Sequence, residues 1–212
     1  MENYIFDFDG TLANSGKTAV LATQAAFRDF EMSLPTTSTV KYYMGVPIEV
    51  SFKKMADRKL ADNEFDELLK DFRTHYQVLE TANLTLFPGI ESVLERLFTS
   101  NKKMFVLSSK HSSALNRNLE QLNILQYFQA TCGSDQVEHY KPAPDGIYHL
   151  VGKYQLHKSK TIMIGDAIYD LQMGLAAEVS TCGVTWGAHA SNLLANENPT
   201  YLINDVQSLL DL

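Results

Sequence analysis

Short, continuously apolar runs alternate along this chain with longer segments in which apolar residues recur every three or four positions. A short apolar run is typical of a strand buried on both faces, whereas the longer spacing is typical of an amphipathic helix. This alternation favours right-handed βαβ units and a mainly parallel sheet, so the predicted fold class is α/β with a Rossmann-like core. The predicted strands end at Phe6 or lie at or near 104–107, 129–132, 161–164 and 180–185.

The segment between the first strand and Leu86 lacks any pattern of a buried strand. Its clearest helix carries an apolar stripe, which we interpret as core packing and whose members are Phe65, Leu68, Leu69, Phe72, Tyr76 and Leu79. Phe87-Pro88-Gly89 then marks the return to the sheet. The predicted domains are therefore an α/β core made of residues 1–14 and 87–212, and a helical subdomain inserted at 15–86.

Composition and charge narrow the class of protein. The chain has 212 residues, 45% of them hydrophobic, which suffices for one domain with a sizeable insertion. A net charge of −7 repels a phosphate backbone, so we expect no nucleic-acid partner. No apolar run approaches the roughly 20 residues that cross a bilayer, and the N-terminus has no signal-peptide layout. We therefore expect no membrane partner and a cytoplasmic location. The six histidines stand apart in the sequence, which argues against a zinc site.

Polar side chains that suit phosphoryl transfer follow three of the predicted strands. Asp7 and Asp9 follow the first strand, Ser108 follows the run 104–107, and Asp166 follows the run 161–164. In open α/β sheets, ligands bind outside the carboxyl ends of the strands, so these groups are expected to face one crevice, with Lys141 on a nearby loop. Each residue alone is an ordinary turn, cap or surface residue, but their joint occurrence in this order indicates a site.

Carboxylates gathered at this edge would repel one another unless a divalent cation lay between them. A small, hard ion with oxygen ligands fits best, which predicts Mg²⁺ shared with a substrate phosphate. Lys141 and the Ser108 hydroxyl would donate to the transferring oxygens. The expected metal ligands are Asp7, Asp9, Asp166 and Asp170.

Four segments resemble the four sequence motifs of the haloacid dehalogenase superfamily. They are Asp7-Phe8-Asp9-Gly10-Thr11-Leu12, the apolar strand into Ser108-Ser109-Lys110, Lys141-Pro142, and Gly165-Asp166-Ala167-Ile168-Tyr169-Asp170. The resemblance extends almost end to end and is greatest to the phosphoglycolate phosphatase-like branch. It implies a HAD-like core in which the segment 15–86 is a mobile helical cap over the active site. Glu178 departs from the pattern, because it stands at a helix end where glycine is frequent.

The resemblance also implies a role for each motif residue. Asp7 would attack phosphorus to form an aspartyl-phosphate, and Asp9 would protonate the leaving oxygen and then activate water. Mg²⁺ would be held by Asp7, Asp166 and the backbone carbonyl of Asp9, with Asp170 completing the acidic cluster. The catalytic set would be Asp7, Asp9, Ser108 and Lys141, and the phosphate-binding set Asp9, Gly10, Ser108, Ser109 and Lys141.

These roles predict a Mg²⁺-dependent phosphatase that hydrolyses a small phosphomonoester, and 2-phosphoglycolate is the substrate we favour. The expected partner is thus a small phosphorylated metabolite, with the chain a monomer or a weak homodimer. A sugar phosphomutase resembling β-phosphoglucomutase, or an inorganic pyrophosphatase, would use the same residues. A phosphate-binding regulator without turnover is a further alternative, from a non-enzymatic class of function. In the cap, the turn 42–47, Lys53 and Lys54 are candidates for leaving-group contacts, although both lysines fit a solvated surface equally well.

Overall fold

A six-stranded parallel sheet forms the centre of the computed structural model, which describes residues 1–212. In spatial order the strands are β5 (Ala130–Cys132), β4 (Lys103–Leu107), β1 (Asn3–Phe6), β6 (Thr161–Gly165), β7 (Ser180–Val184) and β8 (Tyr201–Ile203). Every neighbouring pair is parallel, which confirms the predicted fold class. β1 lies between β4 and β6, so the carboxyl ends of these three strands are adjacent.

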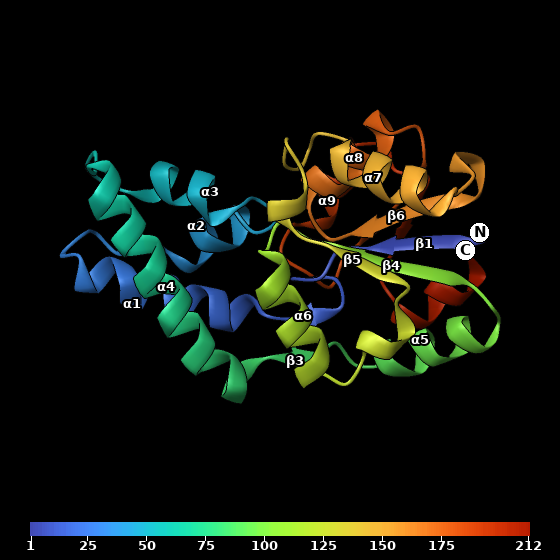
Figure 1. Cartoon of the computed structure of the whole chain (residues 1–212), viewed down its shortest axis with the longest axis horizontal. Helices are drawn as coiled ribbons and strands as arrows, with labels where there is room; N and C mark the ends of the chain where they lie inside the picture. The colour runs from blue at the N-terminus through green and yellow to red at the C-terminus, as the bar shows by residue number, and fades with distance from the viewer.

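Two layers of helices cover the sheet, one on each face (Figure 1). Alternate residues of β1 point to opposite faces: Tyr4 and Phe6 enter one apolar core, and Ile5 enters the other. The first core is closed by α5 (Ile90–Thr99), α6 (Ser112–Gln121) and the 3₁₀ helix η4 (Val206–Asp211). The second face carries α7 (Asp145–Tyr154) and α8 (Ile168–Ala176), and α9 (Ser191–Asn196) lies near α8. The remaining short 3₁₀ helices are η1 (Leu125–Tyr127), η2 (Ser134–Gln136) and η3 (Lys158–Lys160).

Four helices between the first strand and α5 form a separate helical unit at the end of the molecule opposite both termini (Figure 1). They are α1 (Gly16–Asp29), α2 (Thr37–Tyr42), α3 (Ile48–Met55) and α4 (Asp62–Asn83). The unit has its own apolar core, in which Phe27 and Phe52 pack against the stripe predicted for α4. Two strands connect it to the sheet, β2 (Ala13–Asn14) and β3 (Thr85–Leu86), which pair antiparallel. Strands of two residues are too short to show a period, so the sequence did not predict them.

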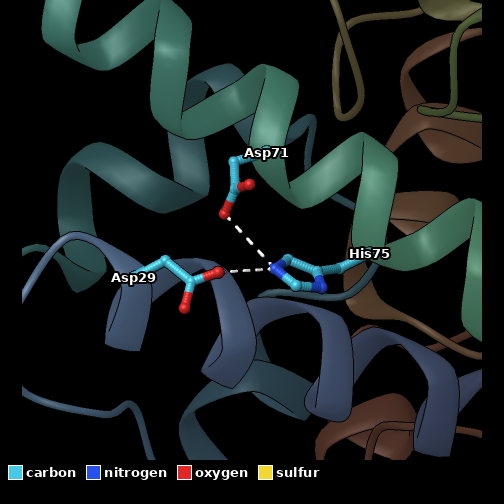
Figure 2. Close-up of side chains that lie close together, drawn as sticks. All are labelled: Asp29, Asp71 and His75. Atoms are coloured by element: carbon cyan, nitrogen blue, oxygen red, sulfur yellow. Dashed lines mark hydrogen bonds and ion pairs between the residues drawn. The ribbon is translucent and has the colours of Figure 1, made fainter.

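A histidine links the two longest helices of this unit (Figure 2). The Nε2 atom of His75 on α4 lies 2.8 Å from Asp29 Oδ2 on α1 and 3.4 Å from Asp71 Oδ2, one turn earlier on α4. A carboxylate can only accept a hydrogen bond, so Nε2 must carry the proton in this arrangement. His75 is therefore a structural bridge between α1 and α4. The sequence pattern did not indicate this bridge, because Asp29 is 46 residues away.

No helix of the structure is both long and apolar enough to cross a membrane.

Glu178, the departure noted at a helix end, has φ +61°, the left-handed conformation for which glycine is preferred.

Candidate active site

The predicted strand-end residues meet at one edge of the sheet. Asp7 follows β1, Ser108 follows β4 and Asp166 follows β6, and all three are buried. Because β4 and β6 flank β1, their ends bring Ser108 and Asp166 to either side of Asp7. The structure thus brings together residues that are up to 159 positions apart in the sequence (Asp7 and Asp166).

Lys141 reaches the same edge from its loop and joins two of the carboxylates. Its Nζ atom lies 2.6 Å from Asp7 Oδ1 and 2.7 Å from Asp170 Oδ1. All three side chains are almost fully buried, with exposed fractions of 3% for Lys141, 3% for Asp7 and 0% for Asp170. A buried ammonium is strongly favoured only when it is paired, and these two carboxylates raise the pKa of Lys141 despite its burial. Lys141 is therefore charged and holds Asp7 in place.

Negative charge exceeds positive charge inside this cluster. Carboxylate oxygens of Asp7, Asp166 and Asp170 lie within 4.8 Å of one another, and Lys141 is the one cation in contact with them. Burial, together with the charge of Asp170, raises the pKa of Asp166 to about 7. Burial likewise raises the pKa of Asp7 well above its usual value, against the opposing effect of Lys141. The protein alone therefore disfavours full ionisation of its own acidic cluster.

The donor set fits a small, hard cation. Asp7 Oδ2 is buried and has no hydrogen-bond partner in the protein, although Oδ1 is held by Lys141. Asp166 is fixed by two donors, Thr11 Oγ1 at 2.8 Å from Oδ1 and the backbone N of Ala188 at 2.6 Å from Oδ2. Each Asp166 oxygen keeps a second lone pair. An orphaned carboxylate oxygen beside two further carboxylates is the arrangement that a divalent ion with oxygen ligands would complete.

Gly10 is required by the shape of this site. Its φ of +91° is favourable only for glycine, and a Cβ at this position would collide with the Asp166 carboxylate. Its N–H donates to the Ala13 carbonyl at 2.8 Å, closing the turn after Asp9. Gly10, predicted as a phosphate-binding residue, is thus a turn residue whose own N–H is already used.

Ser108 and Ser109 sit on the wall of the site. The Ser108 hydroxyl accepts a hydrogen bond from Lys110 N at 3.1 Å, so its own proton stays free for an acceptor. The Ser109 hydroxyl donates to the Gly45 carbonyl of the helical unit at 2.7 Å. Its backbone N–H has no acceptor in the protein. Ser108 therefore offers a side-chain donor to a ligand, whereas Ser109 offers a backbone donor.

A cavity of about 670 Å³ lies between the helical unit and the end of the sheet. Asp7, Asp9 and Ser108 line it from the sheet, and Phe52 and Tyr76 line it from the helical unit. The predicted turn also contributes, through residues 43–46. The two candidate lysines do not line the cavity: Lys53 lies over the Phe65 ring at 4.9 Å, and Lys54 lies over the Tyr43 ring at 5.9 Å. The cavity is large enough for a small phosphorylated molecule.

Three residues near this site were not predicted from the sequence as functional candidates. Lys110 Nζ lies 3.1 Å from Asp9 Oδ1, and the Tyr76 hydroxyl lies 3.3 Å from the same oxygen. His189 is buried and lies 3.0 Å, through Nε2, from the Tyr42 carbonyl of the helical unit. Lys110 directly follows a serine pair at a strand end, which was an available signal. Tyr76 was one member of an apolar stripe, and nothing in the pattern marks His189.

Known proteins with similar sequences and similar folds include hydrolases and phosphatases. Residues 4–184 match the family described as haloacid dehalogenase-like hydrolase. "Pyrophosphatase PpaX" of Oceanobacillus iheyensis is 27% identical over 209 residues, which are 98% of this chain and 94% of that protein. "Phosphoglycolate phosphatase" of Mannheimia succiniciproducens is 24% identical over 214 residues, covering 98% and 96% respectively. Among solved structures, a haloacid dehalogenase-like family hydrolase from Streptococcus pneumoniae superposes with a TM-score of 0.87 at 25% identity, over 100% of this chain and 97% of that one.

Proposed function

Because the chain belongs to the haloacid dehalogenase-like hydrolase family, we propose that it is a Mg²⁺-dependent phosphatase that hydrolyses a small phosphorylated metabolite through an aspartyl-phosphate on Asp7. One observation carries this proposal: the buried Asp7 carboxylate is held by Lys141 through one oxygen, while its other oxygen has no partner. A buried acid whose second oxygen has no partner costs stability unless a ligand completes it. Such a carboxylate suits a nucleophile better than a structural ion pair.

The proposed first chemical step uses Asp7 as the nucleophile and Asp9 as the acid. An oxygen of Asp7 attacks phosphorus, the bond from phosphorus to the leaving oxygen breaks, and Asp9 gives that oxygen its proton. Lys141 keeps the Asp7 carboxylate aimed and ionised, and the free Ser108 hydroxyl proton binds a phosphoryl oxygen. When bound by Asp7, Asp166 and the Asp9 backbone carbonyl, Mg²⁺ would neutralise the phosphate charge so that an anionic nucleophile can approach.

The second step returns the enzyme to its starting state. Water attacks phosphorus of the phosphorylated Asp7, and Asp9, now a carboxylate, takes the proton of that water. The bond between phosphorus and Asp7 breaks, inorganic phosphate leaves, and Asp9 is protonated for the next turnover. We propose that the helical unit is the lid that excludes bulk water during both steps, since it closes the cavity over Asp7 and Asp9.

For the substrate we propose 2-phosphoglycolate first and inorganic pyrophosphate second. The relative from Mannheimia supports the first choice, and the relative from Oceanobacillus supports the second. Both molecules are small anions, and the cavity of about 670 Å³ accommodates either. We place the sugar phosphomutase behind both, and the regulator without turnover last, because the four motif carboxylates and Lys141 are all present.

The test is a screen for Mg²⁺-dependent phosphate release over phosphoglycolate, pyrophosphate, sugar phosphates and nucleotides, with and without a chelator. Asp7→Asn should abolish turnover without changing the melting temperature by more than a few degrees. The matched control is Asp66→Asn, because Asp66 is an exposed carboxylate on α4. A sugar phosphate that is isomerised without phosphate release would show the mutase. No turnover of any compound by the Mg²⁺-loaded wild type would show the regulator.

A further inference from the structure

Lys110 is a partly buried cation, with a side chain 14% exposed, that the proposed chemistry does not use. Its Nζ atom has three acceptors: Asn118 Oδ1 at 2.9 Å, the Tyr76 hydroxyl at 3.0 Å and Asp9 Oδ1 at 3.1 Å. A lysine ammonium has three N–H donors, so every donor is occupied by the protein. The ammonium also lies over the rings of Phe8 and Tyr76, at 5.0 Å and 4.4 Å. Lys110 is therefore saturated, and it can act on a substrate only through its neighbours.

The neighbour that matters is Asp9. Its Oδ1 atom receives two hydrogen bonds, one from Lys110 Nζ and one from the Tyr76 hydroxyl. The tyrosine has one hydroxyl proton, which it gives to Asp9, while its oxygen accepts from Lys110. Asp9 Oδ2 has no partner in the protein, and Asp9 lines the cavity. The pair of donors thus leaves Oδ2 as the oxygen that can carry a proton to a leaving group.

A second layer of contacts holds Lys110 itself. Asn118 is fully buried and turns its amide between two partners: Oδ1 accepts from Lys110, and Nδ2 donates to Glu80 Oε2 at 2.7 Å. Arg117 then donates to both oxygens of Glu80, at 2.8 Å from Nε and 3.2 Å from Nη2. Along this series of contacts, from Asp9 through Lys110, Asn118 and Glu80 to Arg117, every charged group contacts a group of opposite charge or a polar atom. The orientation of Lys110 is consequently fixed from behind.

Two of these residues come from the helical unit and three from the core. Tyr76 and Glu80 lie one turn apart on the same face of α4, whereas Lys110, Arg117 and Asn118 lie at the end of β4 and on α6. The bond from Tyr76 to Asp9 and the bond from Lys110 to Tyr76 can therefore form only while this part of α4 rests against α6. A displacement of α4 would remove the Tyr76 donor from Asp9 and one acceptor from Lys110.

We propose that Lys110 and Tyr76 are positioning residues for Asp9, which fix its carboxylate through Oδ1 so that Oδ2 meets the leaving oxygen only when α4 is docked on the core. This inference rests on the proposed phosphatase function. It assigns the efficiency of leaving-group protonation to a contact between the helical unit and the core. An alternative is that the five residues only join α4 to α6, in which case their loss would lower stability and all activities together.

The experiment compares two classes of phosphomonoester that differ in their need for an acid. A nitrophenyl leaving group departs as a stable anion, whereas the alkoxide of an alkyl phosphate must be protonated as it leaves. The value of kcat/KM reports formation of the phosphoenzyme and is independent of its later hydrolysis. We therefore measure kcat/KM for p-nitrophenyl phosphate and for an alkyl phosphate that the wild type hydrolyses, in Lys110→Met and Tyr76→Phe.

For both variants we expect kcat/KM for the alkyl phosphate to fall at least about tenfold, because a positioned general acid contributes about 10²–10⁴-fold. For the nitrophenyl ester the fall should stay within about twofold. Equal losses for the two esters, or no loss for either, would overturn the inference while leaving the phosphatase standing. A wild type that hydrolyses neither ester nor any other phosphate would refute the proposed function itself, and the inference with it.

A similar trio elsewhere in the chain supplies the controls. Lys158 Nζ lies 3.2 Å from Glu178 Oε2 and 4.9 Å from the Tyr148 ring, far from Asp9 on the other end of the sheet. Lys158→Met and Tyr148→Phe should leave the ratio of the two kcat/KM values unchanged. If Lys110→Met does not fold, as judged by its thermal melt, Tyr76→Phe decides alone, because it removes one hydroxyl and keeps the ring.

Discussion

The acidic cluster makes a quantitative prediction about stability without metal. The pKa of Asp166 rises from 3.8 to about 7 on folding, because burial and the charge of Asp170 disfavour its ionised form. The folded protein then holds this proton more tightly than the unfolded chain does, so the free energy of unfolding falls as pH rises from about 4 to about 7. The change from 3.8 to about 7 corresponds to a contribution of about 4 kcal/mol to the free energy of unfolding, which is lost by the time the pH exceeds about 7. Asp7, whose pKa is also raised, adds to the fall in the same direction.

The measurement is chemical denaturation of the wild type and of Asp166→Asn at half-unit steps from pH 4.5 to 8, in the presence of a chelator. Exposed carboxylates are common to both proteins and cancel in the difference. In the variant, the fall in the free energy of unfolding should be smaller by several kcal/mol, because a neutral amide has no proton to lose. Saturating the wild type with Mg²⁺ at pH 7.5 should restore stability, by about 2.7 kcal/mol at a hundred times Kd.

Two results would refute this reasoning. One is a free energy of unfolding that is the same at pH 5 and pH 7.5 for the metal-free wild type. The other is an Asp166→Asn variant with the full slope of the wild type, which would locate the proton elsewhere. Stabilisation of the variant by Mg²⁺ to the same extent as the wild type would separately remove Asp166 from the metal ligands.

Three further variants test other parts of the site. Lys141→Met leaves the buried Asp7 carboxylate without its cation. It should lower kcat at least about 100-fold, measured by turnover assays, and the free energy of unfolding by about 3–5 kcal/mol at pH 7, measured by denaturation. Gly10→Ala should abolish Mg²⁺ binding measured by calorimetry, because φ +91° and the crowded Asp166 leave no room for a Cβ. His189→Ala should raise KM more than it lowers kcat and speed hydrogen exchange in α2, because it removes the contact to the Tyr42 carbonyl; unchanged exchange would dissociate His189 from the helical unit.

Much of the fold was predictable because its determinants are local. The strand β6 is buried over its five residues and apolar from Ile162 to Ile164, and the stripe of α4 repeats at 3.6 residues per turn. The type of each element can therefore be predicted from its own residues. The left-handed backbone at Glu178 was implied by the family resemblance, because glycine is frequent at that helix end. The two-residue strands β2 and β3 were not, because they are defined by pairing between segments more than 70 residues apart.

The positions of the motif residues were predictable, but their environment was not. A parallel sheet places the carboxyl ends of β1, β4 and β6 on one edge, so Asp7, Ser108 and Asp166 were expected there, and the strand order β4-β1-β6 makes them neighbours. Whether the Gly10 N–H or the Ser109 hydroxyl is free depends on the partners that folding brings to them, here Ala13 and Gly45. Patterns along a chain carry no information on such partners.

The sequence by itself therefore determined the class of fold, the order of its elements along the chain and the acidic residues that follow the central strands. These features depend on hydrophobic periodicity and on Gly and Pro residues that end helices and strands, which act over only a few residues. Only the tertiary structure decided that Lys141 pairs with Asp7 and Asp170, and that Tyr76 of α4 reaches Asp9 beside Lys110. Those contacts join residues 29 to 134 positions apart, and they depend on the docking of whole elements, whose free energy is set by packing surfaces and not by local propensity.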